Sequence, residues 1–367
     1  MVAPKVIIWI DRDTQPLAEV AKGTLEKIAR DFASTIIPRA HQYFGEQSDV
    51  DGNGRVDILF SPIVAKTAAA WVSPCDLIDP KIDPGCSVSN MKDMIYIAPP
   101  ASYAGETQSA ESLLETLAHE FQHLIYFHRK YSLNASQAGL ENPYITEGLS
   151  HLAQDLLGYQ SDNLYHVADT LDHLNVVSLP NILSSKVLGY QGEALDTAQR
   201  GAGYLLLRYL FDQAGGDSID ANGAISDRGG IKWLRGLVEQ PELGIASIEK
   251  ATGKKLSELI LNFWSALALT NRGKDGAAIN DDPRFSYLPT ATDPLTGMQR
   301  GCDLHSPLDG TLMSGPKAQP WEKTAAKINA GGAAYFEIAL PENETELKIA
   351  VDAPEEAKLK VRVFRLK

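Results

Sequence analysis

The sequence lacks several features that would place it at once in a broad class of protein. No run of about 18 apolar residues occurs in it, which excludes a transmembrane helix built from one continuous apolar segment. Basic residues are in the minority: 34 Lys and Arg stand against 47 Asp and Glu, and the net charge of −13 argues against nucleic acid as a partner. The chain has only 3 cysteines and no C-x-x-C pair, so a thiol redox motif and a cysteine-rich zinc site are both excluded.

The composition is that of a folded globular chain. Apolar residues make up 44% and charged residues 22% of the sequence, which excludes wholesale disorder. With 367 residues, the chain is long enough for two domains. Its first ten residues form an apolar stretch that runs into Asp11 and Asp13 without a small-residue cleavage site. We therefore interpret this stretch as a strand and not as a signal peptide.

The periodicity of apolar residues predicts an α+β fold. In the first third of the chain, strands are predicted at Val6–Ile10, Val56–Phe60 and Met94–Ala98, with a helix at Ala18–Ala40. From Ser109 to about Asn271 the chain is predicted to be predominantly helical. The clearest helices are predicted over Glu111–Lys130, Thr146–Leu157, Gly203–Ala214, Ile231–Val238 and Lys255–Leu269.

The same patterns divide the chain into three regions. Residues 1–271 form one domain, with an α/β subdomain over 1–130 and a helical subdomain over 131–271. Residues 272–320 are rich in Gly, Pro, Asp and Asn and are predicted to be an irregular linking segment. Residues 321–367 are predicted to be a small antiparallel, sandwich-like β domain, because Ala334–Leu340, Glu346–Val351 and Leu359–Leu366 alternate apolar and polar residues.

A metal-binding signature lies within the helix predicted over Glu111–Lys130. Residues 119–123 read His-Glu-Phe-Gln-His. Two histidines four residues apart lie about one turn apart on one helix face, which suits two zinc ligands, and Glu120 between them can polarise a water molecule. At 100° per residue, His123 lies at about 40° from His119, whereas the apolar side chains cluster between about 140° and 240°. A core histidine would lie on that apolar stripe, as His128 does, so we interpret His128 as structural.

A third ligand is predicted about two dozen residues further on. Glu147 begins a second amphipathic helix and shares one face with His151 and Gln154, while leucines occupy the other face. One carboxylate there completes a His-His-Glu set that leaves the fourth zinc position open. Taken alone, Glu147 would be an ordinary acid at a helix N-terminus, where the helix dipole favours it.

These two motifs resemble those of the zinc peptidases with a glutamate third ligand, the thermolysin-like gluzincins. Within that group the chain is most similar to the hyicolysin family of secreted bacterial metallopeptidases, and the similarity covers roughly residues 5–270. The segments that carry it are Thr116–Ile125, Thr146–His151, Tyr43–Glu46 with the following Asp-Gly-Asn-Gly loop, and Tyr204–Leu210. The resemblance implies a zincin-like catalytic domain, in which a mixed sheet carries the active-site helix and a helical subdomain closes the cleft.

Carried over residue by residue, the resemblance implies zinc ligation by His119, His123 and Glu147, with Glu120 as general base. Thermolysin-like enzymes have an acid one turn after the ligand glutamate, and it orients a zinc-bound histidine. This chain has His151 there, so the orienting role is expected to pass to Glu115 or Asp155. Such enzymes also donate one hydrogen bond to the oxyanion from a Tyr or His. The candidates here are Tyr204, Tyr190, His151, His166 and His173, and Tyr204 fits a core position better because its helix is rich in leucine.

A second candidate metal site lies between the first helix and the second strand. Asp49, Asp51, Asn53 and Asp57 occupy alternate places of an EF-hand-like loop, and Arg55 could add its carbonyl oxygen. Oxygen ligands in this pattern suit calcium. The twelfth position is Phe60 instead of a glutamate, so a Gly-rich turn capped by Asx side chains is the alternative.

Cys75 and Cys86 bracket a short loop that contains Pro and Asp. A disulfide between them would contribute about 2–3 kcal/mol, and two buried reduced thiols are the alternative. The disulfide would leave Cys302 free. One disulfide with one free cysteine, together with the secreted relatives, predicts a secreted or otherwise extracytoplasmic protein whose signal peptide is absent from this sequence.

We therefore predict a zinc-dependent endopeptidase that hydrolyses peptide bonds in peptide or protein substrates, with a zinc-activated water and Glu120 as general base. Two other hypotheses stay open at this point. One is a peptidase-like binding or adhesion module without activity, although the intact Glu120 and ligand set count against it. The other is a zinc hydrolase of a non-peptide substrate.

Overall fold

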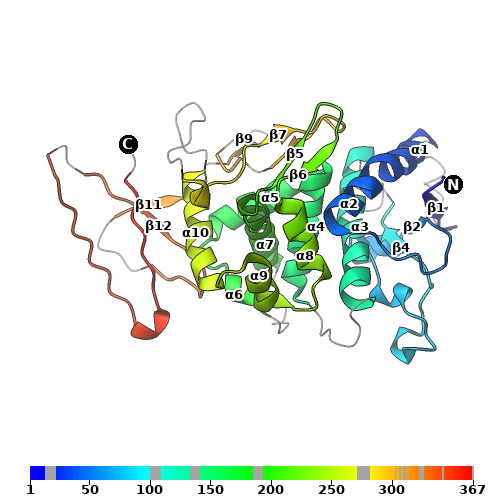
Figure 1. Cartoon of the computed structure of the whole chain (residues 1–367), viewed down its shortest axis with the longest axis horizontal. Coiled ribbons are helices and arrows are strands. Elements are labelled where there is room, and N and C mark those ends of the chain that lie inside the picture. The colour runs from blue at the N-terminus through cyan, green and yellow to red at the C-terminus, as the bar shows by residue number, and fades with distance from the viewer. Residues whose placement is uncertain are drawn as a thin grey trace.

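The structure is a computed structural model. It describes residues 1–12, 22–99, 109–132, 141–184, 193–270, 282–301, 303–305, 307–308, 311–313, 315–321, 326–340 and 343–365. The molecule is elongated, with a four-stranded sheet near the N-terminus, a helical middle and an extended C-terminal part (Figure 1). No helix of the described residues is long and apolar enough to cross a membrane.

The N-terminal sheet has the order β1-β2-β4-β3 and combines parallel and antiparallel pairing, so it is mixed as expected. Its strands are β1 (Val6–Ile10), β2 (Val56–Phe60), β3 (Ala70–Trp71) and β4 (Met94–Ile97). The first two have the predicted bounds. The strands β1, β2 and β4 are parallel, and β3 forms an antiparallel edge on β4. The interior strands β2 and β4 are almost entirely buried, as near-continuous apolar runs in parallel sheets predict.

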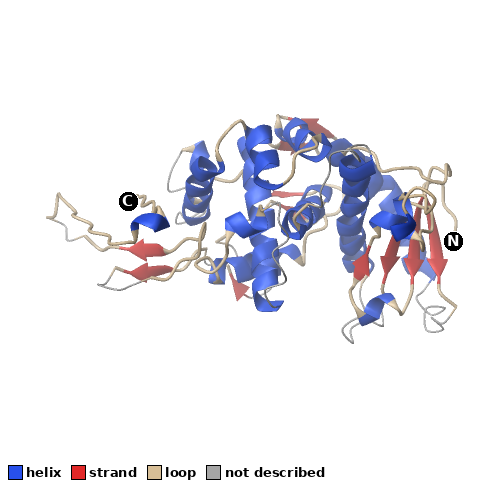
Figure 2. Cartoon of the chain, turned by 90° about the horizontal axis from the view of Figure 1, so that it is seen from below, coloured by secondary structure: helices blue, strands red, loops and turns tan. Residues whose placement is uncertain are grey.

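Two helices, α1 (Lys22–Asp31) and α3 (Ala110–Phe127), pack against this sheet, and α2 (Ile37–Phe44) packs against α3. A π-helical turn, Phe32–Ile36, joins α1 to α2, so the helix predicted over Ala18–Ala40 is interrupted, and its first residues lie outside the described residues. The helix α3 begins where the Ser109 side chain accepts a hydrogen bond from the backbone N–H of Ser112, and a second π turn, His128–Ser132, follows it. The sheet and the long α3 lie side by side in Figure 2.

The rest of the chain up to Leu269 is mainly helical, as predicted. Its helices are α4 (Pro143–Leu157), α5 (Asn163–Asp172), α6 (Leu179–Ile182), α7 (Glu193–Gln213), α8 (Gly230–Glu239), α9 (Gly244–Thr252) and α10 (Leu256–Leu269). A short hairpin, β5 (Asp217–Ile219) with β6 (Ile225–Asp227), follows α7. The central helix α7 packs against both α4 and α5, and one continuous cluster of buried side chains joins the sheet to these helices.

Glycines allow α4 and α7 to approach each other closely. A Cβ atom added to Gly148 on α4 would lie 2.8 Å from the carbonyl carbon of Gly203 on α7. A Cβ atom added to Gly203 would lie 2.8 Å from the carbonyl oxygen of Tyr144. Real Cβ atoms do not approach this closely, so the absence of a side chain at both positions sets the separation of the two helices.

The described part of the predicted linking segment is anchored to the helical body by buried ion pairs. Its strands β7 (Ala291–Thr292) and β8 (Gln299–Arg300) form a short hairpin. Asp293 within the hairpin is fully buried and lies 2.7 Å from the guanidinium of Arg39, which also donates to the carbonyl of Leu157. Arg300 pairs with Asp217 at 2.9 Å. This part of the segment is therefore packed against the helical body and is not a free linker.

The predicted antiparallel β domain at the C-terminus is wrong for the described residues. The one predicted strand that forms a ladder there is β12 (Tyr335–Glu337), and it pairs in parallel with β11 (Ala318–Pro320). A further two-stranded pair, β9 (Pro307–Leu308) with β10 (Thr311–Leu312), precedes it. The described residues of the other two predicted strands are extended but lie in no ladder, and a 3-10 turn, Glu355–Ala357, stands between them.

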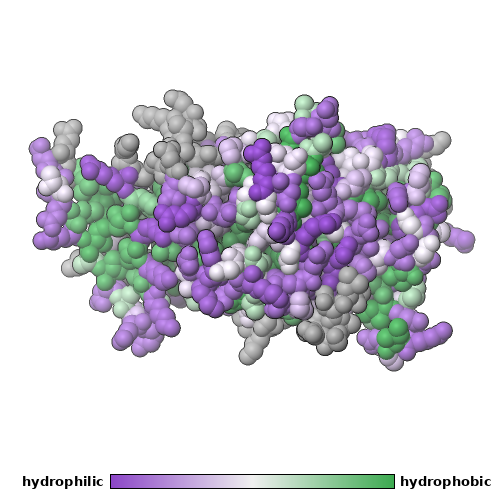
Figure 3. Space-filling model, in the orientation of Figure 1, coloured by the Kyte–Doolittle hydropathy of each residue, from purple (hydrophilic) through white to green (hydrophobic). Residues whose placement is uncertain are grey.

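The predicted C-terminal strands do not pair with one another because period-two alternation favours an extended chain without specifying its partner. Apolar side chains of this region stay exposed, and they gather in the green surface at the C-terminal end of the molecule (Figure 3). They are Leu340, Leu347, Val351, Leu359, Val361 and Val363.

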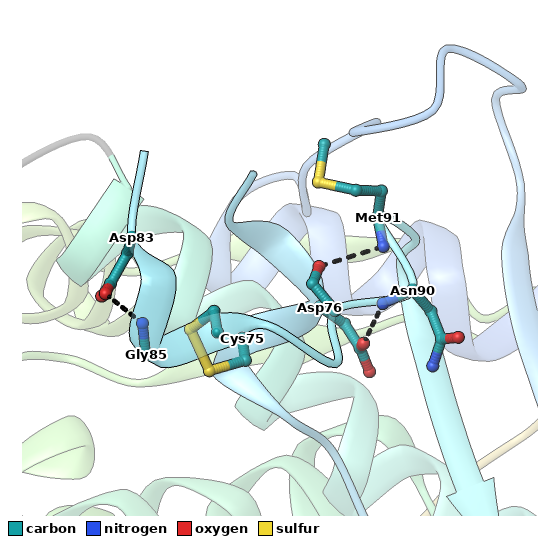
Figure 4. The surroundings of a disulfide bond; sticks show 8 residues. Cys75, Asp76, Asp83, Gly85, Asn90 and Met91 are labelled. Carbon is teal, nitrogen blue, oxygen red and sulfur yellow. Dashed lines mark hydrogen bonds between the residues drawn. A yellow bond between two sulfur atoms is a disulfide. The ribbon is translucent and has the colours of Figure 1, made fainter. Parts of the chain in front are cut away.

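The predicted disulfide is present and closes a loop made of two 3-10 turns, Pro74–Leu77 and Pro84–Cys86 (Figure 4). Cys75 and Cys86 are bonded, with 5.0 Å between their Cα atoms. Inside the loop, the buried Asp76 carboxylate accepts hydrogen bonds from the backbone of Asn90 at 2.7 Å and from the hydroxyl of Tyr96 at 2.7 Å. The predicted free thiol, Cys302, lies outside the described residues.

We expect the Gly148→Ala variant to be destabilised by about 2–4 kcal/mol, because the added methyl group forces α4 and α7 apart. The matched control is Gly236→Ala on α8, where an added Cβ meets no atom within 4 Å, and this change should stabilise the helix by up to about 1 kcal/mol. Urea unfolding of both variants measures the two effects. Equal stability of the two variants would contradict the proposed close packing.

Removal of the disulfide in a Cys75→Ser, Cys86→Ser double variant should lower the free energy of unfolding by about 2–3 kcal/mol, because the short loop is no longer closed in the unfolded chain. Thermal unfolding in the presence and absence of a reductant measures the loss. Titration of the denatured, unreduced wild-type protein should detect one free thiol, and three free thiols would contradict the pairing.

Candidate metal centre

Two helices bring the predicted ligands together. His119, Glu120 and His123 lie on α3, and Glu147 lies on α4, which Asn142 caps by accepting a hydrogen bond from the backbone N–H of Tyr144. The Nε2 atom of His119 lies 3.2 Å from one carboxylate oxygen of Glu147, and the Nε2 atom of His123 lies 3.6 Å from the other. Tetrahedral ligands at about 2.0–2.1 Å from one zinc ion are about 3.3 Å apart. The observed separations therefore suit a shared metal ion.

The chemistry of the surrounding atoms also fits a cation. His119, Glu147 and His151 offer ligand atoms that all lie within 4.8 Å of one another. The Nδ1 atom of His123 and the Nε2 atom of His151 are buried and have no hydrogen-bond partner in the described residues. The side chains of His119 and Glu147 keep 13% and 18% of their surface exposed, so solvent reaches the group. Two imidazoles that face one carboxylate in a partly open site form a suitable donor set for zinc.

Arg200 is a member of the site that the sequence patterns did not indicate. Its guanidinium forms an ion pair with the Glu147 carboxylate, and its Nε atom donates to Asp196 at 2.8 Å. Burial raises the pKa of Glu147, but its contacts with His119 and His123 outweigh this effect and hold the pKa well below the ordinary value. Glu147 is therefore ionised at neutral pH.

The environment of Glu120 differs from that of Glu147. Glu120 is buried, and the loss of solvation raises its pKa to about 7, with a further contribution from the nearby charge of Glu147. His119 and Arg200 act in the opposite direction. A carboxylate that titrates near neutral pH can both accept and return a proton, which is what a general base in hydrolysis requires.

A polar chain lies behind the histidines, and Gln154 is its centre. The Oε1 atom of Gln154 lies 3.1 Å from Nδ1 of His119 and 2.8 Å from Nδ1 of His151. Its Nε2 atom donates to Glu115 at 3.0 Å. Glu115, one of the two expected orienting acids, thus reaches His119 through Gln154 and not directly. The sequence did indicate Gln154, because Gln154 shares a helix face with Glu147.

The other expected orienting acid, Asp155, belongs to a separate buried network. It lies 2.5 Å from the guanidinium of Arg208, and it accepts hydrogen bonds from the hydroxyl of Tyr204 at 2.9 Å and from the backbone of Gly301 at 2.7 Å. Tyr204 is fully buried, so it is a core residue, in line with the leucine-rich helix around it. Neither residue contacts the histidines through a hydrogen bond of the described structure.

The remaining candidates for the oxyanion donor lie in different surroundings, some buried beside the candidate metal centre and others more exposed. The His151 ring lies 4.5 Å from the ring of His166, and burial lowers the pKa of both, to about 4 for His166. His173 is more exposed and interacts with Asp169 at the end of α5. Tyr190 lies outside the described residues. His128, interpreted as structural, is half-buried and its Nδ1 atom has no partner in the described residues.

The candidate calcium loop is held by hydrogen bonds of the Asx-turn type. Asp49 accepts from the backbone of Gly54 at 2.9 Å, Asn53 accepts from the backbone of Arg55 at 2.6 Å, and Asp51 pairs with Lys92 at 2.7 Å. Asp57 lies on β2 and accepts from the indole of Trp9. Among the described residues, the one group of acids and histidines with metal-like spacing includes none from this loop. Calcium binding stays a prediction.

Comparison with known proteins points to a distant metalloprotease relationship. A scan against models of known protein families finds no match. A curated relative is the neutral metalloprotease ShpI of Staphylococcus hyicus, 25% identical over 261 residues. The alignment covers 66% of this chain and 52% of the relative, so the chain spans about half the length of that protein. This similarity and the group formed by His119, Glu147 and His151 together indicate a metal ion.

We expect the Glu115→Gln variant to change how stability depends on pH. Burial raises the pKa of Glu115 to about 7, and Asp162 adds to the shift, while donors from Ser161 and the backbone oppose it. The ordinary value of 4.5 applies to the unfolded chain. The folded state therefore binds more protons between these values, and wild-type stability, relative to the variant, should fall by about 3 kcal/mol as the pH rises from about 4.5 to 7.

The measurement is urea unfolding of chelator-treated protein at several pH values. The control is Glu111→Gln, which removes an exposed acid from the first turn of the same helix and should leave the pH dependence unchanged. A pH-independent difference between wild type and Glu115→Gln would contradict the raised pKa.

Proposed function

We propose that this chain is a zinc-dependent endopeptidase, with zinc held by His119, His123 and Glu147 and with Glu120 as general base. The observation that carries the proposal is the Glu147 carboxylate, whose two oxygens face the Nε2 atoms of both histidines at 3.2 and 3.6 Å. The distant similarity to a neutral metalloprotease supports it. The pattern His-Glu-Phe-Gln-His alone would predict the two histidines, but the facing carboxylate from a second helix is what makes a three-ligand site.

When bound, zinc would act as a Lewis acid that polarises a peptide carbonyl and a water molecule. The chain's own residues handle the proton. Glu120 accepts it from the attacking water and delivers it to the amine of the leaving peptide, and its raised pKa near 7 suits both transfers. Arg200 lies against Glu147 and compensates part of the negative charge that Glu147 and Glu120 would otherwise concentrate there.

The hydrogen-bond pattern narrows the choice of oxyanion donor. His151 uses its Nδ1 atom toward the oxygen of Gln154, so its Nε2 atom carries a lone pair and cannot donate. Tyr204 already donates to Asp155. His166 donates to the backbone of Thr197, and because its Nδ1 atom has no partner in the described residues, the donating atom is Nε2 and Nδ1 carries the lone pair of the neutral ring. These contacts occupy the donors of His151, His166 and Tyr204, so the oxyanion donor stays unassigned.

An extracytoplasmic location is proposed on the basis of the Cys75–Cys86 disulfide, because such bonds persist in oxidising compartments and are rare in the cytosol.

The Glu120→Gln variant tests the peptidase proposal. It should bind one zinc ion per chain as the wild type does, yet hydrolyse casein or gelatin about 10²–10⁴-fold more slowly, because the proton acceptor is lost while the ligands remain. Zinc analysis and a protease assay measure the two quantities. Wild-type activity should disappear after chelation and return with added zinc.

The control is Glu111→Gln on the same helix, which should retain full activity. Stoichiometric zinc with negligible hydrolysis in both wild type and Glu120→Gln, across broad peptide libraries, would refute the peptidase and favour the inactive binding module. Hydrolysis of esters or other non-peptide substrates alone would favour the alternative zinc hydrolase.

A further inference from the structure

We propose that Gln154 is a positioning residue that sets the proton positions of His119 and His151 through a single amide oxygen. The inference rests on the metal centre proposed above, because it assigns a role to the residues behind that centre. The observation that supports the inference is a pair of contacts: Oε1 of Gln154 lies 3.1 Å from Nδ1 of His119 and 2.8 Å from Nδ1 of His151. One acceptor shared by two imidazoles requires that both imidazoles donate to it.

The orientation of the Gln154 amide follows from Glu115. The Oε1 atom of Glu115 accepts from the backbone N–H of Asp162 at 2.9 Å, and its Oε2 atom accepts from the hydroxyl of Ser161 at 2.5 Å. Because the Asp162 N–H can only donate, Oε1 of Glu115 acts as an acceptor, whichever charge state the carboxyl group has. The part of the Gln154 amide that faces Glu115 must therefore be the NH₂ group, and its oxygen must face the histidines.

The orientation of the Gln154 amide also fixes the state of the Nε2 atoms of His119 and His151. Because both Nδ1 atoms donate to the Gln154 oxygen, the Nε2 atoms of both neutral rings carry lone pairs. The Nε2 atom of His119 faces Glu147, and the Nε2 atom of His151 is buried without a partner in the described residues. Two adjacent anionic or lone-pair acceptors repel each other unless a cation lies between them. Gln154 therefore holds His119 in the form that binds a metal and disfavours the form that would donate to Glu147.

Three elements supply this arrangement. Glu115 stands one turn before His119 on α3, Gln154 stands on α4, and Ser161 and Asp162 immediately precede α5. Glu115 and Gln154 are 1% and 5% exposed, so water does not compete for these hydrogen bonds. The chain from Glu115 to the histidines thus links the metal centre to the start of α5.

The isosteric change Gln154→Met removes the amide and retains the volume of the side chain. The matched control is Gln122→Met: Gln122 is a buried amide in the same α3–α4 interface, hydrogen-bonded to Ser150 at 2.7 Å, and it has no hydrogen bond to a histidine among the described residues. Loss of a buried amide is common to both variants, whereas loss of the histidine acceptor is specific to Gln154→Met.

The first readout is the tautomer of each ring in chelator-treated protein, measured by long-range ¹H–¹⁵N NMR at about pH 8, where imidazoles are neutral. Assignments come from His119→Gln and His151→Gln. In the wild type and in Gln122→Met, both rings should carry the proton on Nδ1. In Gln154→Met, His119 should shift toward the Nε2–H form, which can donate to Glu147. The variant Gln154→Glu, with one proton shared between the new carboxyl group and Glu115 in place of the amide N–H, retains an acceptor oxygen toward the rings and should restore the Nδ1–H form.

The second readout is zinc affinity, measured by competition with a chromophoric chelator. Gln154→Met should bind zinc about 10–100-fold more weakly than the wild type, and Gln122→Met should lie within about 3-fold of it. Equal losses in the two variants, or unchanged tautomers in Gln154→Met, would overturn the proposal. An Nε2–H tautomer at His119 or His151 in the wild type would overturn it without reference to any variant.

These outcomes are separate from those of the peptidase test. A protein that binds zinc but cleaves no peptide would refute the proposed function, while the tautomers and the zinc affinities of the variants would still decide the role of Gln154. The tautomer measurement needs neither metal nor substrate.

Discussion

The Glu147 carboxylate is the group on which the rest of the site depends. It faces two imidazoles of α3 and the guanidinium of Arg200 on α7, so it connects three helices at one point. Such a group can be buried only if its charge is compensated, and the compensation comes from residues that are far apart in the sequence. The close approach of α4 to α7 at Gly148 and Gly203 brings Arg200 within reach. Backbone packing and electrostatics therefore support the same arrangement.

The helices α3 and α4 each have an apolar part and a polar part, and each part has a separate role. Leucines and Phe121 on α3, with Leu149 and Leu152 on α4, are fully buried in the common core and supply the packing energy. The polar part contains the histidines, Gln154 and Glu115, whose hydrogen bonds specify how the rings are oriented. Because buried polar groups are costly when they lack partners, this polar part selects one relative rotation of the two helices.

How much of this could be read from the sequence depended on how local each interaction is. The periodicity of α3 placed His119 and His123 opposite the apolar stripe, and the same argument placed Glu147 on the polar face of α4. Arg200 could not be found in this way, because it lies 53 residues from Glu147 and precedes the helix predicted over Gly203–Ala214. The observed helix α7 begins ten residues earlier than predicted, at Glu193, and so includes Arg200. The C-terminal strands failed for a related reason: alternation favours extension, but strand partners are a tertiary property.

This chain has His151 where the gluzincin pattern has an acid, and the charges around that position explain the difference. An acid at that position would add a negative charge beside Glu115, Glu120 and Glu147, against the one guanidinium that lies on Glu147. The pKa of Glu120 is already raised to about 7, and another nearby negative charge would raise it further, so a smaller fraction of Glu120 would be ionised and able to accept a proton at neutral pH. Gln154 offers an acceptor oxygen without a charge. The buried carboxylate of Glu115 remains one residue further from the histidines, where it orients the amide through a hydrogen bond and does not contact the proposed metal ligands directly. A neutral residue thus orients the rings while the number of charges beside Glu120 stays low.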